Sequence, residues 1–344
     1  MATNPQDVKA VLVQNRAAAL AYAQRVGSSR VQELLQFAEK DLLARLESVK
    51  GSNTFTEEHL KTMLRQVRLV TMQLVDSMAS TLADESGSLS SFAGQSTIDY
   101  ITTADEAFRG IGTQPLALRE ASVFDSAKEG ARSSILSRLM NDPEHPASQG
   151  VLARYGTGTV GEFEKILRVG VLTRKGIDDV KGGLVKASPF LQGKPSHWAE
   201  RIARTELMGA YNRAGWEAHR EIDTQLGDMV KILSATFDDR TAADSYAVHG
   251  QIRRPDEAFE TWYGFMQHPP ARPNDREVVI PHRISWEIPD YLKPRGWGEV
   301  VARWLREGRK GSPPSRPNMT TVDLSLFGKE PEEPEEPEEP EEPE

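Results

Sequence analysis

Apolar residues recur every three or four positions through the first 140 residues of the chain, and this period predicts a series of long amphipathic helices. A first helix starts at Asp7 and is expected to end at Gly27. Capping-box signals at Ser29 and at Thr54 predict the starts of two more helices. The connections between these helices are short, which favours antiparallel packing. Such stripes are typical of core-forming helices rather than of a cofactor site.

Two stretches of small residues interrupt the helical pattern and are predicted to be loops. The first is SGSLSSFAGQS at residues 86–96. The second is GTGTVG at residues 156–161, which matches a dinucleotide-binding fingerprint, with Asp178 or Asp179 about twenty residues further on. Its context does not fit, because VLARY before it is a poor buried strand and no alternating strands and helices follow. We therefore interpret it as a flexible loop that leads into a helix at Glu162.

A later helix carries an unusual combination of small and polar residues. Between a predicted N-cap at Ser196 and a predicted stop at Gly227, the sequence contains ARTELMGAYNRAGWEA at residues 203–218. Its narrow apolar stripe, which lets another backbone approach closely, consists of Ala199, Ala203, Leu207, Ala210, Ala214, Ala218 and Ile222. The polar residues of interest on the same helix are Arg204, Thr205, Glu206 and Asn212.

From residue 229 onward the pattern becomes short and irregular. Alternating apolar residues within MVKILSATF (229–237) predict a strand, and EVVI (277–280) and ISWEI (284–288) are two further strand candidates. An amphipathic helix is predicted at 297–309. The patterns together predict an α+β fold that is predominantly α, with a small antiparallel sheet and irregular proline-rich loops.

Four segments follow from these patterns. We expect a helical region at 1–150, an α+β domain at 151–292, a basic helix and linker at 293–329, and an acidic tail of glutamate and proline at 330–344. The tail cannot bury a core and its like charges extend it, so we expect it to be disordered.

Charge is concentrated at the C-terminal end of the chain. The formal net charge is −9, but ten glutamates lie in residues 330–344, and without them 42 basic side chains face 41 acidic ones. In the basic stretch just before the tail, the candidates for phosphate contacts are Arg303, Arg306, Arg309, Lys310 and Arg316. An ordinary solvated helix face explains these cations equally well. If they bind DNA, the acidic tail is expected to compete for them.

The chain contains no cysteine. This excludes disulfides, thiolate metal ligands and a cysteine nucleophile, and it suits a reducing cytoplasm. No apolar run approaches the ~18 residues that a membrane span needs, and the N-terminus lacks the pattern of a signal peptide. We therefore predict no membrane association.

Three histidines offer an enzymatic alternative. His249, His268 and His282 have several aspartates nearby in sequence and are the candidate ligands of a metal-dependent nuclease or hydrolase. None of them shows a tight ligand spacing, such as two histidines four residues apart on a helix. The sequence also contains no Walker loop and no nucleophile elbow. We therefore expect no catalytic residue, no metal and no cofactor.

Three motifs occur in order in the second half of the chain. ARTE at 203–206 is followed by DRT…HG at 239–250 and by PP..PN.R at 269–276. This ordered set resembles the Mu F-type minor head proteins of tailed phages, the phage head morphogenesis family, and the resemblance covers residues 155–285. The motif residues that it singles out are Arg204, Thr205, Glu206, Asn212, Asp239, Arg240, Thr241, His249, Gly250, Pro270, Pro273, Asn274 and Arg276.

The chain departs from many members of this family at four positions. Those relatives carry paired cysteines in the second and third motifs, which implies a metal site. The corresponding residues here are Ala242, Ser245, Asp275 and Glu277. The first two cannot ligate zinc usefully, so the polar motif residues are expected to be structural. We predict that Arg204, Glu206 and Asn212 brace proline-rich loops, which supply few backbone hydrogen bonds of their own.

The resemblance implies a minor capsid protein without enzymatic activity, present in few copies and bound to the portal protein inside the procapsid. It implies further contacts with scaffold protein, major capsid protein and packaged DNA, and roles in head assembly and in DNA packaging or delivery. The protein would then reside in the virion head, and in the host cytoplasm during assembly. The long helices before residue 141 are expected to carry the portal contact. The alternatives are the metal-dependent hydrolase and a free nucleic-acid-binding adaptor.

Overall fold

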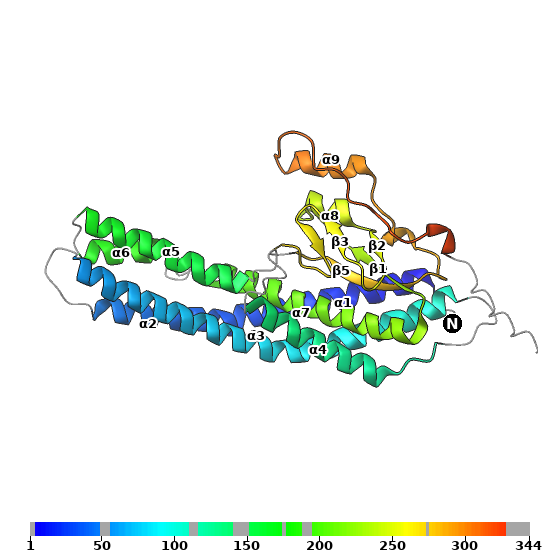
Figure 1. Cartoon of the computed structure of the whole chain (residues 1–344), viewed down its shortest axis with the longest axis horizontal. Helices are drawn as coiled ribbons and strands as arrows, with labels where there is room; N and C mark the ends of the chain where they lie inside the picture. Colours follow the sequence, from blue (N-terminus) through cyan, green and yellow to red (C-terminus); the bar gives the residue numbers. More distant parts are fainter. Residues whose placement is uncertain are drawn as a thin grey trace, which may run out of the picture.

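The computed structural model describes residues 4–48, 56–109, 116–139, 151–173, 177–187, 195–272 and 275–327. As predicted, the fold is α+β and mostly helical, with a small antiparallel sheet. Long helices lie side by side along the longest axis of the molecule, and the sheet packs on them toward one end (Figure 1).

The first two helices form one continuous rod. They are α1 (Pro5–Val26) and α2 (Gln32–Glu47), joined by a π-helical turn at Gly27–Val31. The prediction that Gly27 ends the first helix is wrong, because its backbone is right-handed helical, with φ −63° and ψ −46°. Ser29, the predicted second N-cap, lies inside this turn and donates its hydroxyl to the Arg25 carbonyl at 2.8 Å. The wider turn accommodates these residues without ending the helix.

The loop predicted at residues 86–96 is also helical. It lies inside α3 (Glu57–Phe108), a helix of 52 residues. The serine hydroxyls bond back to carbonyls of the same helix, as Ser86 does to Ala83 and Ser90 does to Gly87, each at 2.7 Å. Serine therefore satisfies its own polar group here and does not need a turn.

Four further helices are α4 (Glu120–Leu139), α5 (Val151–Leu172), α6 (Ile177–Ala187) and α7 (Pro195–Leu226). The flexible loop predicted at residues 156–161 is wrong, because this segment lies within α5, and no strand precedes it in the described ranges. Helix α7 agrees with its predicted limits, and Gly227 ends it at φ +76°. Within the described ranges, no helix is both long and apolar enough to cross a membrane.

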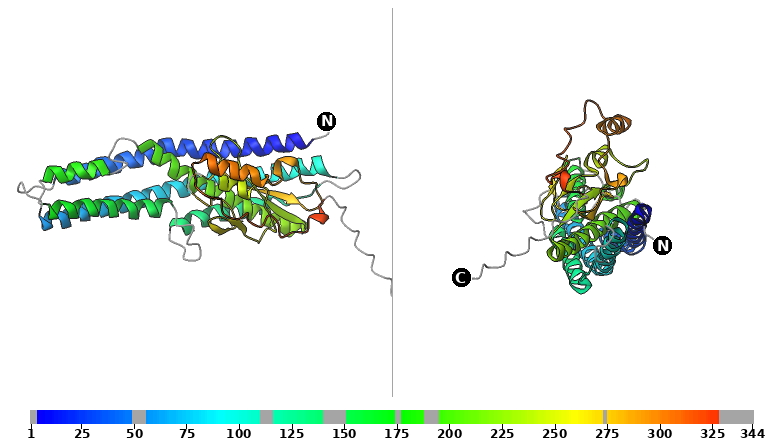
Figure 2. Two further views of the ribbon diagram at one scale, coloured as in Figure 1. Left: turned by 90° about the horizontal axis from the view of Figure 1, so that it is seen from above. Right: turned by 90° about the vertical axis from the view of Figure 1, so that its right-hand side faces the viewer.

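The helices divide into an arm and a base (Figure 1, Figure 2). In the arm, α2, the first half of α3, α5 and α6 extend beyond the sheet. In the base, α1, the second half of α3, α4 and α7 lie beneath the sheet, and α7 contacts the other three. The arm thus projects from a base that also supports the sheet.

The sheet has three antiparallel strands in the order β2-β1-β5. They are β1 (Met229–Ser234), β2 (Ile252–Arg253) and β5 (Val278–Arg283), and a separate hairpin joins β3 (Phe259–Thr261) to β4 (Gly264–Met266). The strand candidates at 229–237 and 277–280 thus correspond to β1 and β5. Strand β5 continues through Pro281, which is tolerated because β5 lies at an edge of the sheet.

Two predictions near the C-terminus need correction. Residues 284–288 do not form a strand, because the chain turns at this point, with the Trp286 N–H donating to the Arg283 carbonyl at 3.1 Å. The last helix, α9 (Trp297–Arg306), is shorter than the predicted 297–309. A short helix, α8 (Ala243–Val248), lies between β1 and β2 and contacts α9.

One hydrophobic core joins the base to the sheet. Its buried members run from Val8 in α1 through Leu74 in α3 to Ile280 in β5. Six members of the small-residue stripe of α7 are buried in it, namely Ala203, Leu207, Ala210, Ala214, Ala218 and Ile222, and the side chain of Ala199 lies outside the described part. The segments on either side of residue 150 therefore share one core.

Close packing of the base gives a first prediction. A β-carbon on Gly94 of α3 would lie 3.1 Å from the Phe124 ring of α4, whereas one on Gly87 of the same helix would meet nothing within 4 Å. We expect Gly94→Leu to lower the free energy of unfolding by about 1–3 kcal/mol through overpacking. The control Gly87→Ala should raise it by up to about 1 kcal/mol through helix propensity. Denaturant unfolding measures both, and a Gly94→Leu variant as stable as the wild type would contradict the packing argument.

Candidate functional site

Two of the three sequence motifs meet at one end of the sheet, and the helix that carries the third motif lies against them. The DRT segment follows β1, and the PP..PN.R segment leads into β5, its neighbour in the sheet, where Ser234 pairs with Val278. Helix α7 lies against the second of these segments, because the side-chain Nδ2 of Asn212 donates to the Glu277 carbonyl at 3.1 Å in a buried contact. Segments far apart in the sequence thus form one cluster, here called the motif cluster.

The DRT segment is a tight turn held by its own side chains. The Thr241 hydroxyl accepts a hydrogen bond from the Asp238 N–H at 2.8 Å and contacts the Thr236 carbonyl as a donor. The Asp238 carboxylate accepts from the Arg240 N–H at 2.9 Å. Aspartate and threonine at this spacing are typical of such side-chain-capped turns. The turn connects β1 to α8.

The HG pair fixes the backbone that follows α8. His249 Nδ1 accepts a hydrogen bond from the Ala235 N–H at 3.1 Å, and burial lowers the pKa of this histidine to about 4. The ring is therefore a neutral acceptor at pH 7. Gly250 adopts φ +77°, and a β-carbon on it would lie 2.5 Å from the Pro294 nitrogen. Both the backbone conformation and the neighbouring chain require glycine here.

Two arginine–carboxylate pairs tie the third motif to the second. Arg276 forms a bidentate pair with Asp238, at 2.6 and 2.7 Å, and holds the pKa of that carboxyl well below its usual range. Arg272 pairs with Asp244 at 2.6 and 3.0 Å. Burial alone would raise the pKa of Asp244, but Arg272 outweighs it and the net shift is downward. Both carboxylates are thus ionised cross-links at neutral pH.

Part of the third motif cannot be placed. Pro270 follows a cis peptide bond, Pro269–Pro270, whereas Pro273 and Asn274 lie outside the described residues. The acidic tail at 330–344 lies outside them as well.

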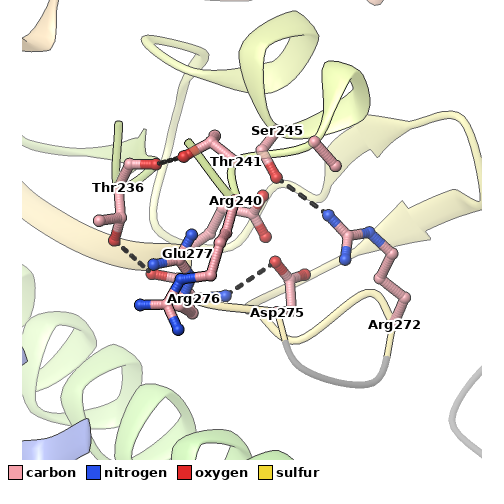
Figure 3. Close-up of a pocket in the computed structure, with 9 residues that line it drawn as sticks. Thr236, Arg240, Thr241, Ser245, Arg272, Asp275, Arg276 and Glu277 are labelled. Atoms are coloured by element: carbon pink, nitrogen blue, oxygen red, sulfur yellow. Dashed lines mark hydrogen bonds between the residues drawn. The ribbon is translucent and has the colours of Figure 1, made fainter. Parts of the chain in front are cut away.

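A cavity of about 30 Å³, room for a single water, opens between the two segments (Figure 3). The residues that line it are Thr236, Arg240, Thr241, Ala242, Ser245, Arg272, Asp275, Arg276 and Glu277. They include Ala242, Ser245, Asp275 and Glu277, the four positions that correspond to cysteines in the family that the motifs resemble, so the fold brings these positions together.

The residues around this cavity do not fit a zinc ion. Ala242 has no donor atom, and the Ser245 hydroxyl accepts a hydrogen bond from Arg272 at 3.2 Å. The two carboxylate oxygens of Asp275 accept from two backbone N–H groups at 2.9 and 3.0 Å. Arginines line the place where a cation would sit. The two ion pairs, rather than a metal, therefore hold the segments together.

Two side chains of the ARTE motif make contacts within their own helix. Arg204 forms an ion pair with Glu200, one turn earlier on α7, at 3.8 Å, and its bracing of the loops stays a prediction. The Thr205 hydroxyl donates to the Arg201 carbonyl at 2.8 Å, and Glu206 is buried. The predicted bracing of the third motif is made by Asn212.

The three histidines proposed as metal ligands lie in different surroundings. His249 contacts Phe237, His268 contacts Trp216, and His282 lies in the core against Phe108, Trp286 and Phe327. Among the residues that the structure describes, no three His, Cys, Asp or Glu side chains gather in a way that could hold a metal ion.

The basic candidates fall into two groups. Three make internal contacts: Arg303 donates to the Asp239 carbonyl, Arg309 lies over the Trp304 ring at 4.6 Å, and Arg316 donates to the Arg295 carbonyl. Arg306 and Lys310 are exposed. Arg309 and Arg316 are exposed as well, so the two groups differ in their internal contacts rather than in exposure.

Sequence reasoning missed Arg272 and Lys231, and it considered Asp238 and Asp244 only as neighbours of candidate metal ligands. Asp238 stands three residues before Thr241, a spacing that itself predicts a capped turn. Lys231 is fully buried in β1, where its Nζ donates to the carbonyl and the side-chain oxygen of Gln267 at 3.1 and 2.9 Å, and burial lowers its pKa to about 7. An alternating strand pattern gives no signal for a buried lysine.

Comparison of the chain with protein-family models, with curated proteins and with solved structures finds no match. The interpretation therefore depends on the order of the motifs and on the geometry of the motif cluster.

The tight approach at Gly250 gives a second prediction. Gly250→Ala places a β-carbon against the backbone at Pro294 and strains a left-handed conformation, so we expect the free energy of unfolding to fall by about 3 kcal/mol or more. Gly308 is a matched control because its φ of +71° is similar and a β-carbon there would meet nothing. Gly308→Ala should cost only about 1–2 kcal/mol from strain. Equal losses in thermal unfolding would show that the neighbouring chain is irrelevant.

The buried histidine of β5 gives a prediction about pH. Burial lowers the pKa of His282 to about 4, below its ordinary 6.5, so folding favours the neutral ring. Its contribution is complete above pH 6.5 and is lost as the pH falls toward 4, by on the order of 3 kcal/mol. His282→Phe should therefore flatten the pH dependence of the free energy of unfolding between pH 6.5 and 4.

Three other groups contribute to the background of this measurement. Burial lowers the pKa of His219 to about 3 and that of His249 to about 4, which leaves a residual slope of the same sign. Burial raises the pKa of Asp275 to about 6, so its stabilising effect grows as the pH falls and opposes the histidines. Identical slopes for the wild type and His282→Phe would refute the assignment to His282.

Proposed function

We propose that this chain is a minor head protein of a tailed phage, bound in few copies to the portal protein inside the procapsid. It would support head assembly and DNA packaging or delivery, with scaffold protein, major capsid protein and DNA as further contacts. The observation that carries the proposal is the ordered set of three motifs. The segments of the second and third are joined by Asp238 and Arg276, and the helix that carries the first reaches the backbone just after the third through Asn212. A set of short motifs that are distant in sequence but form one cluster is better explained by a shared fold than by coincidence.

The roles of the motif residues support a structural protein. Several motif residues cap a turn, pair two segments or permit close packing, as Thr241, Arg276 and Gly250 do. The cavity at the cluster has room for one water and not for a substrate. We therefore place the function on the outer surfaces of the molecule.

The arm is the surface that we assign to the portal contact. Its helices expose large apolar side chains, of which Phe37 is 72%, Met72 is 65% and Leu172 is 83% exposed. Exposed apolar side chains of this size are typical anchors of protein–protein interfaces. Phe37 and Met72 lie in the region before residue 141 for which the sequence predicts the contact.

Point variants of the full chain test this assignment better than fragments, because the segments on either side of residue 150 share one core. We expect Phe37→Asp combined with Met72→Asp to weaken capture of the co-expressed portal protein of the same phage more than tenfold. Phe265→Asp combined with Leu324→Asp, on the other side of the molecule, is the matched control and should leave capture unchanged. Circular dichroism checks that both variants fold.

Retention of the portal by the arm variant would reject the arm as the contact. Loss with the control variant alone would move the contact to the sheet domain. If the purified protein instead binds no portal, holds a stoichiometric metal and cleaves DNA, the hydrolase alternative replaces the proposal. Salt-dependent DNA binding without any portal association would favour the free adaptor.

A further inference from the structure

The outer side of α9 and the tip of the β3–β4 hairpin form one surface. Trp262 of the hairpin meets Trp304 of α9 edge-on, with ring centroids 5.6 Å apart. The exposed members of this surface are Tyr263, Phe265, Leu305, Arg306 and Lys310. Phe265 is 76% and Leu305 is 60% exposed. We call these five residues the α9 surface, and its mixture of bare apolar groups and cations is unusual for a solvated face.

Next to the α9 surface, two tryptophans already bind backbone carbonyls of a proline-containing segment. The indole Nε1 of Trp262 donates to the Ser315 carbonyl and that of Trp304 donates to the Gly311 carbonyl, each at 3.1 Å. The bound stretch, residues 311–317, reads GSPPSRP. Indole donors and aromatic rings that hold a proline-containing strand are the chemistry by which polyproline II segments are recognised.

The acidic tail has the period of a polyproline II helix. Its prolines are Pro331, Pro334, Pro337, Pro340 and Pro343, one at every third residue. A polyproline II helix has three residues per turn, so all the prolines would align on one face and the glutamates would occupy the other two. In this form the tail presents an apolar ridge flanked by carboxylates.

Charge and reach both favour an encounter of the tail with this surface. Residues 293–316 hold seven cations and two glutamates. The ion pairs described there use Lys293, Arg303 and Arg309, while Arg295 lies over the Phe237 ring and Arg316 donates to the Arg295 carbonyl. This leaves Arg306 and Lys310 for an acidic partner. The described chain ends at Phe327, in the core beside His282. Residues 328–344 span about 50 Å as polyproline II, more than the ~35 Å diameter of a domain of ~100 residues.

We propose that the acidic tail docks on the α9 surface of its own chain as a polyproline II helix. Its prolines pack against Tyr263 and Phe265, and its glutamates lie beside Arg306 and Lys310. The occupied surface no longer offers these two cations to DNA phosphates, so the tail regulates what the α9 surface can bind. This proposal is independent of the portal assignment.

The absence of native cysteine permits a direct distance measurement in the full chain. Glu338→Cys in the tail and Ala302→Cys on α9 are labelled with nitroxides, and double electron–electron resonance is recorded at low salt. We expect a narrow distance distribution. Labels at Glu338→Cys and Gln73→Cys, on the arm, provide a pair remote from the α9 surface that reports the same tail. Dilution with unlabelled protein keeps only distances within one chain.

Two sets of variants separate the contributions. Arg306→Glu with Lys310→Glu should widen the distribution at least twofold, whereas Arg65→Glu with Lys165→Glu, the same charge change on exposed arm residues, should not. A tail of equal composition with its prolines moved off the three-residue period should widen it as well. A broad distribution in the wild type, or one that narrows only without dilution, overturns docking within the chain. No effect of the shuffled prolines overturns the polyproline II contact in favour of charge alone.

Discussion

The structure depends on how closely other backbones can approach α7. One side of this helix carries alanines that are fully buried. The helices that pack against it also place small residues in the interface. A β-carbon on Gly130 of α4 would lie 2.7 Å from Glu217 of α7, which shows how little space separates the two helices. Because the helices of the base pack this closely, α7 lies at a fixed distance from the sheet. Asn212 can therefore reach the backbone at Glu277.

Above that contact, short polar links replace the regular hydrogen bonding that the irregular segments lack. Thr241 and Asp238 cap the turn after β1, His249 accepts a backbone hydrogen bond, and Arg272 and Arg276 pair with carboxylates across the gap. Arginine suits this task because its planar group makes two parallel bonds and so fixes direction as well as distance. Removing one partner of either pair leaves the other as a partly buried charge without compensation, and this destabilises the fold.

The sequence predicted the fold class, α7 and the two long strands, because a sustained apolar period indicates which face of an element is buried. The sequence-based prediction was wrong where the local conformational preference of the residues differs from the structure that tertiary packing imposes. Residues 86–96 and 156–161 are rich in serine and glycine, which favour turns locally, yet they lie in helices whose neighbours need small side chains or tolerate them. The helix end predicted at Gly27 was wrong for the same reason. At the motif cluster, the motifs were found but the pairing of Asp244 with Arg272 was not, because these residues meet only through the fold.

The continuous rod of α1 and α2 has a mechanical consequence. A helix broken at Gly27 would act as a hinge, and the arm would swing independently of the sheet. With the π-helical turn intact, and with α3, about 78 Å long, running through both arm and base, the arm is a lever fixed at one end. A force applied at its tip is carried as torque into the base under the sheet, where Val8 and α7 lie in the same core.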